Sequence, residues 1–406
     1  MKEKSAFRSV WIASYVFVLA SILAMNNGIG SIQTIGFFFV LAVGAMLPVE
    51  QLLMFIVMME PLGAIYRING RYTVMPFLFI ILFVKLVAGN KTISKKKLIP
   101  MFGLMAISIY NYVTRGYNIS TYVGFFIALL CFVWASGNKC INMQRVFEKS
   151  IWLFVLSVLI ESIASRTMPT VVRMVREVSA YEYRLAGFTS SWNYGRHVVV
   201  AIAFLVYWLR YQNGNKLIAG ALIGYFLECM ISTGLYSGLL AIGLMLLLIP
   251  FSFQGTIKQR ITYVSISLLV CAVVFLIIYN YVYLPMYNLR GQMSDNGRFD
   301  IWKMYYDIFV NDAGIFFGGI GAGAIQDYAA SKSILTTHSI VIEKLFELGI
   351  VGTGLLIFLI SGCTRKQNQR ISTNGRLLPL ATFLGTCLTQ GVSGNELIFI
   401  LMIICI

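Results

Sequence analysis

The chain has 406 residues, of which 58% are hydrophobic and only 12% are charged, whereas about a quarter of the residues in a soluble domain are charged. A soluble chain of this length would form two or three domains, and so few charged residues are not enough to cover the surfaces of those domains. The formal net charge of +16 would suggest a nucleic-acid partner in a soluble protein, but no nucleic-acid-binding motif is present, and cytoplasmic loops of membrane proteins collect Lys and Arg. We therefore expect a membrane protein with no nucleic-acid partner.

Apolar runs recur along the whole chain, and most are roughly 15–22 residues long, enough to cross a bilayer as a helix. We expect one integral membrane domain over residues 1–406, an all-α bundle of about 12–14 transmembrane helices with two long extracytoplasmic loops containing short amphipathic helices. The second and third runs are short enough to be re-entrant. The expected spans are residues 10–26, 32–48, 51–66, 73–88, 98–113, 119–136, 150–165, 197–211, 216–231, 235–251, 261–282, 338–361, 377–391 and 395–406.

The distribution of basic residues predicts how these spans are oriented. Short basic loops favour the cytoplasmic side, and nearly all of them fall inside when the N-terminus is cytoplasmic. Residues 166–196 and 283–337 then form the two long extracytoplasmic loops. Most basic residues on this outer side are arginines, whose guanidinium groups suit bidentate binding of phosphate or carboxylate. The pattern favours an anionic substrate at the outer face.

The first long loop contains two groups of arginines. Arg173 and Arg176 are three residues apart, so they share one face of a predicted amphipathic helix on the membrane surface. Arg184 and Arg196 bracket the segment "LAGFTSSWNYG". Arginines at such places either snorkel towards lipid headgroups or bind substrate. We favour snorkelling for the first pair and substrate binding for Arg184.

The second long loop predicts a helix followed by a glycine-rich turn. The segment "SDNG" supplies capping residues before "RFDIWKMYYDIF", in which Ile301, Trp302, Tyr305 and Ile308 fall on one face. Arg298 would lie in the first turn, where the helix dipole disfavours a cation, and this unfavourable placement suggests a function. Residues 318–324, "GGIGAGA", lack the Lys-Ser/Thr of a P-loop, so we expect tight turning or close packing there.

The segment "TTHSIVIEKLFELGIVG" opens the next expected span with polar groups. His338, one of only two histidines, lies at the outer mouth, either as an interfacial anchor or as part of a site. Glu343, Lys344 and Glu347 lie deeper, where ionisable residues should face the bundle interior. The spacing of Lys344 and Glu347 predicts that they pair.

Together, "GRFDIW", "FFGGIGAGA" and "THSIVIEKLFELGIVG" resemble the signature shared by O-antigen ligases and the Wzy-type repeat-unit polymerases of O-antigen or capsule. In that family an Arg-x-x-x-Trp helix precedes a Gly-x-Gly turn, and a histidine opens a span with Glu-x-Gly-x-x-Gly. The spacing from Arg184 to Gly195 is similar to the family's other outer loop. One departure is Ser339, since Asn often follows the family's histidine. The matching residues here are Arg298, Trp302, Gly319, Gly321, His338, Glu347, Gly349 and Gly352.

The resemblance implies glycosyl transfer at the outer face of the bacterial plasma membrane, with an undecaprenyl-diphosphate oligosaccharide as donor and another as acceptor. Arg184 and Arg298 would bind the diphosphate, with Arg196 and Arg290 as secondary candidates. His338 would orient or deprotonate the acceptor hydroxyl. Two further residues are expected to contribute to the substrate site: Glu347, which lies below it, and Trp302.

No metal or other cofactor is expected, because the outer face has no paired histidines and no DxD motif. Beyond the lipid bilayer, a chain-length regulator and a flippase are candidate partners. The Arg184–Gly195 spacing and Ser339 favour a polymerase that joins the repeat units into surface polysaccharide, and two alternatives stay open. One is a ligase that transfers finished polysaccharide to a terminal acceptor. The other is a transporter or flippase of lipid-linked sugars, although such proteins tend to have repeated halves and no internal repeat is evident.

Overall fold

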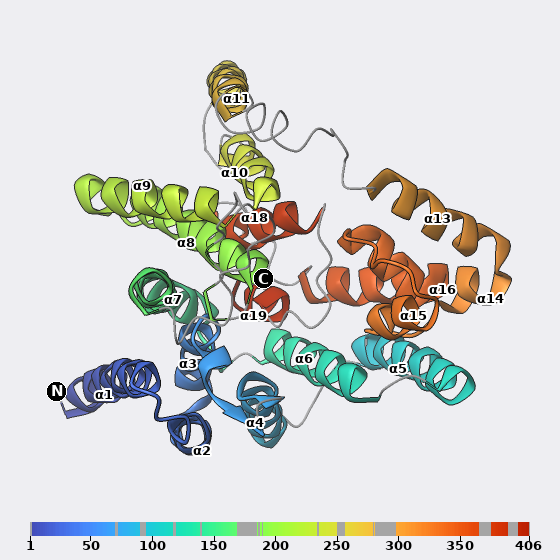
Figure 1. The fold of residues 1–406 in the computed structure, drawn as a ribbon, viewed down its shortest axis with the longest axis horizontal. Helices are drawn as coiled ribbons and strands as arrows, with labels where there is room; N and C mark the ends of the chain where they lie inside the picture. Colours follow the sequence, from blue (N-terminus) through green and yellow to red (C-terminus); the bar gives the residue numbers. More distant parts are fainter. Residues whose placement is uncertain are drawn as a thin grey trace. The chain divides into compact units, whose positions relative to one another are not determined.

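The computed structural model describes residues 2–69, 72–89, 95–116, 119–138, 140–168, 185, 187–188, 190–233, 235–249, 256–278, 280, 298–364, 375–388 and 397–405. Apart from one two-stranded hairpin, the regular elements in these ranges are helical (Figure 1), which confirms the all-α prediction. The α-helices are α1 (Lys2–Asn26), α2 (Ile32–Met46), α3 (Val49–Met59), α4 (Met75–Gly89), α5 (Lys95–Arg115), α6 (Ile119–Gly137), α7 (Met143–Thr167), α8 (Ser191–Tyr211), α9 (Lys216–Ser232), α10 (Tyr236–Leu248), α11 (Ile257–Ile278), α13 (Arg298–Asn311), α14 (Ala313–Gly318), α15 (Ile325–Ser331), α16 (Ile340–Thr364), α18 (Leu378–Cys387) and α19 (Leu397–Cys405).

Each apolar segment expected to be a span contains one of these helices, because long apolar runs with few helix breakers leave the backbone little alternative. The prediction for residues 51–66 was wrong beyond Met59, where α3 ends. Pro61 lacks the amide that a continued helix needs, and a 3-10 helix, η1 (Gly63–Ile65), follows. The chain then forms an unpredicted antiparallel hairpin of β1 (Arg67–Ile68) and β2 (Tyr72–Thr73).

Two helical segments in the described ranges are long and apolar enough to cross a membrane alone, Ser9–Asn26 in α1 and Ile340–Cys363 in α16. Several shorter apolar helices accompany them, among them α2, α4 and α18. Large apolar side chains are also exposed along α1, α5 and α11. A membrane protein is consistent with these features, and its full span count stays a prediction.

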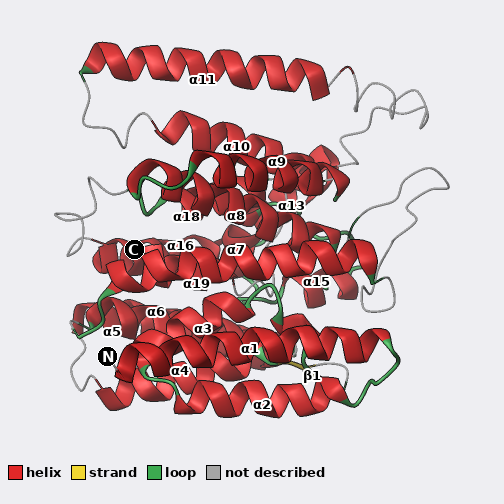
Figure 2. Cartoon of the chain, turned by 90° about the vertical axis from the view of Figure 1, so that its left-hand side faces the viewer, coloured by secondary structure: helices red, strands yellow, loops and turns green. Residues whose placement is uncertain are grey.

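The chain forms two compact units, and each is described by itself. Unit 1 comprises residues 1–89 and 139–235. Its helices contact one another in the order α1, α2, α4, α3, α7, α8, α9. The pair α1 and α2 lies side by side in Figure 2. Gly36 of α2 lets Tyr66 approach closely, since a Cβ there would lie 2.2 Å from the tyrosine ring.

Unit 2 comprises residues 90–138 and 236–406. One row of contacts runs from α11 through α10, α18 and α19 to α6, and α5 and α6 both contact α16. The helices of the segment 298–331, α13, α14 and α15, all contact α16 and lie around it in Figure 1. The segment expected to be the second half of a long outer loop is therefore built onto the helix that follows it.

Candidate functional site

Two side chains of α13 fasten this helix to the segment that leads into α16. The indole nitrogen Nε1 of Trp302 donates to the carbonyl of Thr337 at 2.7 Å, and the Tyr305 hydroxyl donates to the carbonyl of Leu335 at 3.0 Å. Burial raises the pKa of the Tyr305 phenol, so it stays a neutral donor. Ile301 and Tyr305 are buried and Trp302 is half-buried, so the face that these residues were predicted to share is the one that packs inward.

His338 follows directly and has a left-handed backbone, with φ of 50°. Its neighbours Thr337 and Ser339 are buried, and the carbonyl of Ser339 accepts from the Glu343 amide in the first turn of α16. A non-glycine residue in this conformation is costly and persists only where its surroundings fix it. The bonds from Trp302 and Tyr305 to the preceding carbonyls supply that constraint.

The glycine-rich turn crosses α16 at the point where that helix is interrupted. Gly349 has φ 64° and ψ −177°, which is not helical, and Gly319 has a matching φ of 69° and ψ of −169°. The amides of Ile320 and Gly321 donate to the carbonyls of Phe346 and Glu347 at 3.1 and 2.7 Å. A Cβ on Gly349 would lie 2.5 Å from the carbonyl oxygen of Phe317, so only glycine fits the crossing. The expected close packing is confirmed, and the helix in the expected span over 338–361 is kinked at Gly349.

Glu347 is fully buried and binds groups of the chain itself. Its Oε2 atom lies 2.6 Å from Nζ of Lys344, which confirms the predicted pair, and the amide of Ile325 donates to Oε1 at 3.4 Å. Lys344 Nζ is also 3.1 Å from Oε1 of Glu343 and lies over the Phe125 ring. In this structure Glu347 therefore holds the start of α15 against α16.

Four of the predicted site residues that the structure describes lie in unit 2. Arg298 is the first residue of α13, one turn before Trp302 on the same face, although its side chain is outside the described part. Arg184 and Arg290 lie outside the described residues altogether. Arg196 belongs to unit 1, on α8, where it is buried and donates from Nη1 to Oδ1 of Asn193 at 3.3 Å. Helices α13 and α16 and the segments next to them carry these four predicted site residues: Arg298, Trp302, His338 and Glu347.

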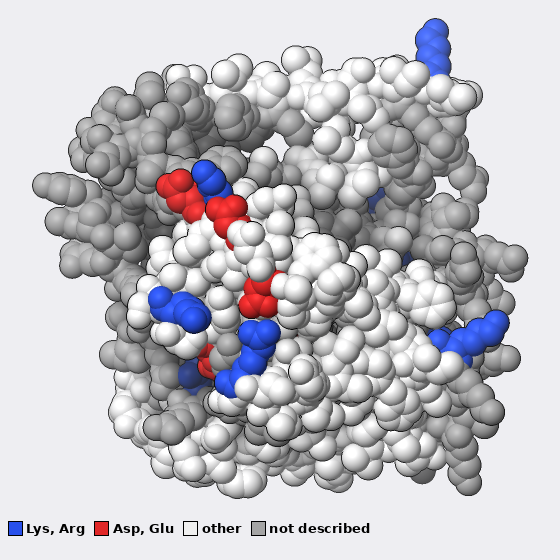
Figure 3. Space-filling view, turned by 90° about the vertical axis from the view of Figure 1, so that its right-hand side faces the viewer, with Lys and Arg blue, Asp and Glu red and all other residues white. Residues whose placement is uncertain are grey.

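A shallow pocket of about 600 Å³ adjoins the same turn. Asn111, Thr114 and Arg115 of α5 line one side of it, and Gly314 and Gly318 of α14 line the other. Asn111 donates to the carbonyl of Gly318 at 2.9 Å, which joins the two walls. Figure 3 shows charged side chains gathered on part of the face that includes this region, with largely uncharged surface around them. Exposed charges on α13 and beside α14 are Asp300, Lys303, Asp307 and Asp312.

Unit 1 contains a buried cluster that the sequence analysis missed, here called the Glu-His-Glu cluster: Glu60, His197 and Glu161. Nε2 of His197 lies 2.8 Å from Oε2 of Glu60, and Nδ1 lies 2.8 Å from Oε2 of Glu161. The signal was present, since ionisable residues inside apolar segments are expensive and often functional. All three had been placed in or at the end of expected spans. Among the described residues, no group of three or more His, Cys, Asp or Glu side chains is arranged to hold a metal.

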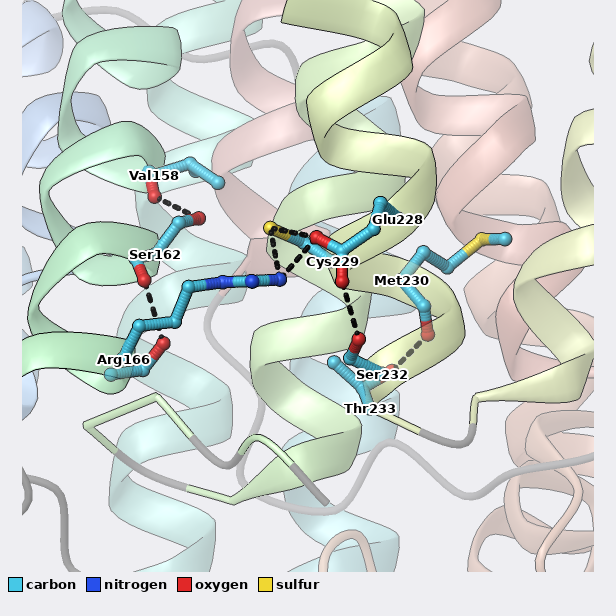
Figure 4. Close-up of polar contacts among 9 residues, drawn as sticks. Val158, Ser162, Arg166, Glu228, Cys229, Met230, Ser232 and Thr233 are labelled. Atoms are coloured by element: carbon cyan, nitrogen blue, oxygen red, sulfur yellow. Dashed lines mark hydrogen bonds and ion pairs between the residues drawn. The ribbon is translucent and has the colours of Figure 1, made fainter. Parts of the chain in front are cut away.

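The C-terminal end of α7 carries a more exposed ionic contact (Figure 4). Arg166 pairs with Glu228 of α9 and lies 3.7 Å from Sγ of Cys229. The hydroxyl of Ser232 donates to the other carboxylate oxygen of Glu228 at 2.9 Å. Because Arg166 is 35% exposed and Glu228 is 53% exposed, the pair is a surface contact between two helix ends.

Comparison of the chain with protein-family models, with curated proteins and with solved structures gives no significant match. The family therefore stays a prediction from the motifs. What the structure adds is the spatial arrangement of the residues that carry them.

Proposed function

We propose that the chain is an integral membrane glycosyltransferase of the O-antigen ligase and polymerase superfamily. Its reaction would be the polymerisation of undecaprenyl-diphosphate-linked repeat units at the outer face of the bacterial plasma membrane. One observation carries the proposal. Motif residues from three separate stretches of sequence meet around α16, where Trp302 binds the carbonyl before His338 and the Gly319 turn packs against Gly349.

Exposed apolar surface supports the membrane part of the proposal. On α1, Ile12 is 64% exposed, and on α5, Val113 is 80% exposed. Soluble proteins seldom leave extended apolar faces uncovered, whereas lipid covers them at no cost. The two segments long enough to span a bilayer, in α1 and α16, point to the same environment.

The chemistry assigned to the site follows from the leaving group. Breaking the anomeric bond leaves charge on a diphosphate, which arginine side chains stabilise in a water-poor site. Arg298 and Arg184 are assigned to this charge, with Arg196 and Arg290 as further candidates. His338 is assigned to the acceptor hydroxyl, which must be placed behind the anomeric carbon and lose its proton.

Substitutions at His338 test the assignment without confusing chemistry with backbone strain. His338→Gly removes the imidazole at a position whose left-handed φ glycine adopts readily, so the substitution adds no backbone strain. Loss of general acid–base catalysis should lower the turnover of purified protein with lipid-linked repeat units by roughly 10²–10⁴-fold. The matched control is Lys303→Ala on the exposed side of α13, which should keep wild-type turnover. Normal turnover of His338→Gly would remove His338 from the mechanism.

The products formed distinguish the alternatives. A polymerase yields lipid-linked chains of increasing length from repeat units alone. A ligase needs a separate terminal acceptor and leaves single repeat units unchanged. Wild-type protein that moves lipid-linked sugars across a vesicle membrane without forming glycosidic bonds would favour the transporter and refute the proposal.

A further inference from the structure

The Glu-His-Glu cluster joins three helices inside unit 1. Glu60 follows the end of α3, Glu161 lies on α7, and His197 lies on α8. The side chains of His197, Glu60 and Glu161 are 3%, 7% and 0% exposed. Both ring nitrogens are within 2.8 Å of a carboxylate oxygen, so neither nitrogen has room for a ligand between it and its partner.

The two contacts of His197 differ in geometry. Nδ1 shares a hydrogen bond of 2.8 Å with Oε2 of Glu161, whereas Nε2 and Oε2 of Glu60 are at ion-pair distance without the alignment of a hydrogen bond. A buried carboxylate such as Glu161 is stable only with further hydrogen bonds to it.

Such a hydrogen bond comes from the loop before α8. The amide of Phe188 donates to Oε1 of Glu161 at 3.1 Å, the oxygen that does not face His197. Gly187 has φ 57°, and a Cβ there would lie 2.3 Å from the same oxygen. The amide of Leu185 donates to the carbonyl of Ser232 at 3.0 Å. The loop is thus fastened to α9 on one side and to the cluster on the other.

We propose that Glu161 is a positioning residue, which His197 and Glu60 orient so that it holds Gly187 and Phe188, just before the start of α8. His197 fixes Oε2 of Glu161, and this leaves Oε1 aimed at the amide of Phe188. The start of α8 carries Arg196, a candidate for donor binding. The consequence for donor binding rests on the proposed function, whereas the anchoring itself does not.

Hydrogen exchange of the peptide covering 185–190 tests the anchoring. Glu161→Ala removes the acceptor, and exchange should become about tenfold faster or more. Glu161→Gln should keep slow exchange, because its amide oxygen still accepts from Phe188 while its NH₂ group donates to a neutral His197. The matched control is Glu148→Gln, the same change on the same helix, outside the cluster.

A second variant covers the case in which Glu161→Ala does not fold. Gly187→Ala keeps all three side chains of the cluster but places a Cβ 2.3 Å from Oε1 of Glu161 and 2.8 Å from Cβ of Tyr194, so it should weaken the contact of Glu161 with the loop and also speed exchange of this peptide. Exchange at the wild-type rate in the folded Glu161→Ala or Gly187→Ala variant would overturn the proposal.

Kinetics of repeat-unit polymerisation test the consequence. Glu161→Ala should raise KM for the lipid-linked donor at least about tenfold, and Glu161→Gln should restore it towards the wild-type value. Equal loss in both variants, with slow exchange kept in Glu161→Gln, would show that the charge matters rather than the anchoring, and would overturn the positioning role. If wild-type protein transfers no glycosyl group, the proposed function fails while the exchange measurement still decides the anchoring.

Discussion

Replacing Gly349 with alanine should damage the crossing between the glycine-rich turn and α16, whereas the same change at Gly354 should not. At Gly349 the backbone has φ 64° and ψ −177°, a region that is nearly exclusive to glycine and costs other residues about 1–3 kcal/mol. The new Cβ would lie 2.5 Å from the carbonyl oxygen of Phe317 and 2.6 Å from the amide nitrogen of Gly319. These are backbone atoms, so no side-chain rotation relieves the contact.

The expected magnitude follows from what the crossing contains. Separating the two backbones breaks the hydrogen bonds from the Ile320 and Gly321 amides, each worth about 1 kcal/mol net. With the conformational strain, Gly349→Ala should lower the free energy of unfolding by about 3 kcal/mol or more. Gly354 is on the same helix with open space around its Cβ position, and alanine there favours the helix by up to about 1 kcal/mol.

The assay compares half-lives of the folded state for the two purified variants at one elevated temperature in the same detergent, because large proteins often unfold irreversibly. A difference of 3 kcal/mol expressed wholly in the unfolding rate is about 150-fold. Half-lives that agree within about twofold would refute the reasoning, since they would mean that the turn does not hold α16 in its interrupted form.

Three further substitutions separate buried from exposed contacts. Trp302→Phe keeps the ring but loses the donor to the buried Thr337 carbonyl, so we expect a loss of about 1–3 kcal/mol together with reduced glycosyl transfer; unchanged transfer would contradict the role given to α13. Lys344→Met leaves two buried carboxylates without their cation and should cost about 3–5 kcal/mol by thermal half-life, and wild-type stability would contradict the buried ion cluster. Arg166→Ala removes only an exposed pair with Glu228 and should cost less than about 1 kcal/mol by the same measurement; a larger loss would mean that this contact is protected from water.

Local features of the structure were predictable from the sequence. Apolar runs predicted the positions of the long apolar helices, and the helix expected over "RFDIWKMYYDIF" begins at Arg298 in the structure. The Lys344–Glu347 pair followed from a spacing of three residues. All of these depend on interactions within a few turns of one helix, which the order of residues fixes directly.

Only the tertiary structure decided which distant residues meet. Glu60 and His197 are far apart in sequence, and a lone histidine in an apolar segment does not reveal its partners. Glycine at 349 is compatible with a continuous helix, and the interruption arises because the carbonyls of Phe346 and Glu347 bind the amides of a turn from another segment. The left-handed backbone of His338 likewise depends on bonds from α13. The sequence alone determined where helices form, while packing between segments determined where a helix breaks and which polar groups share its interior, because those contacts depend on the whole fold.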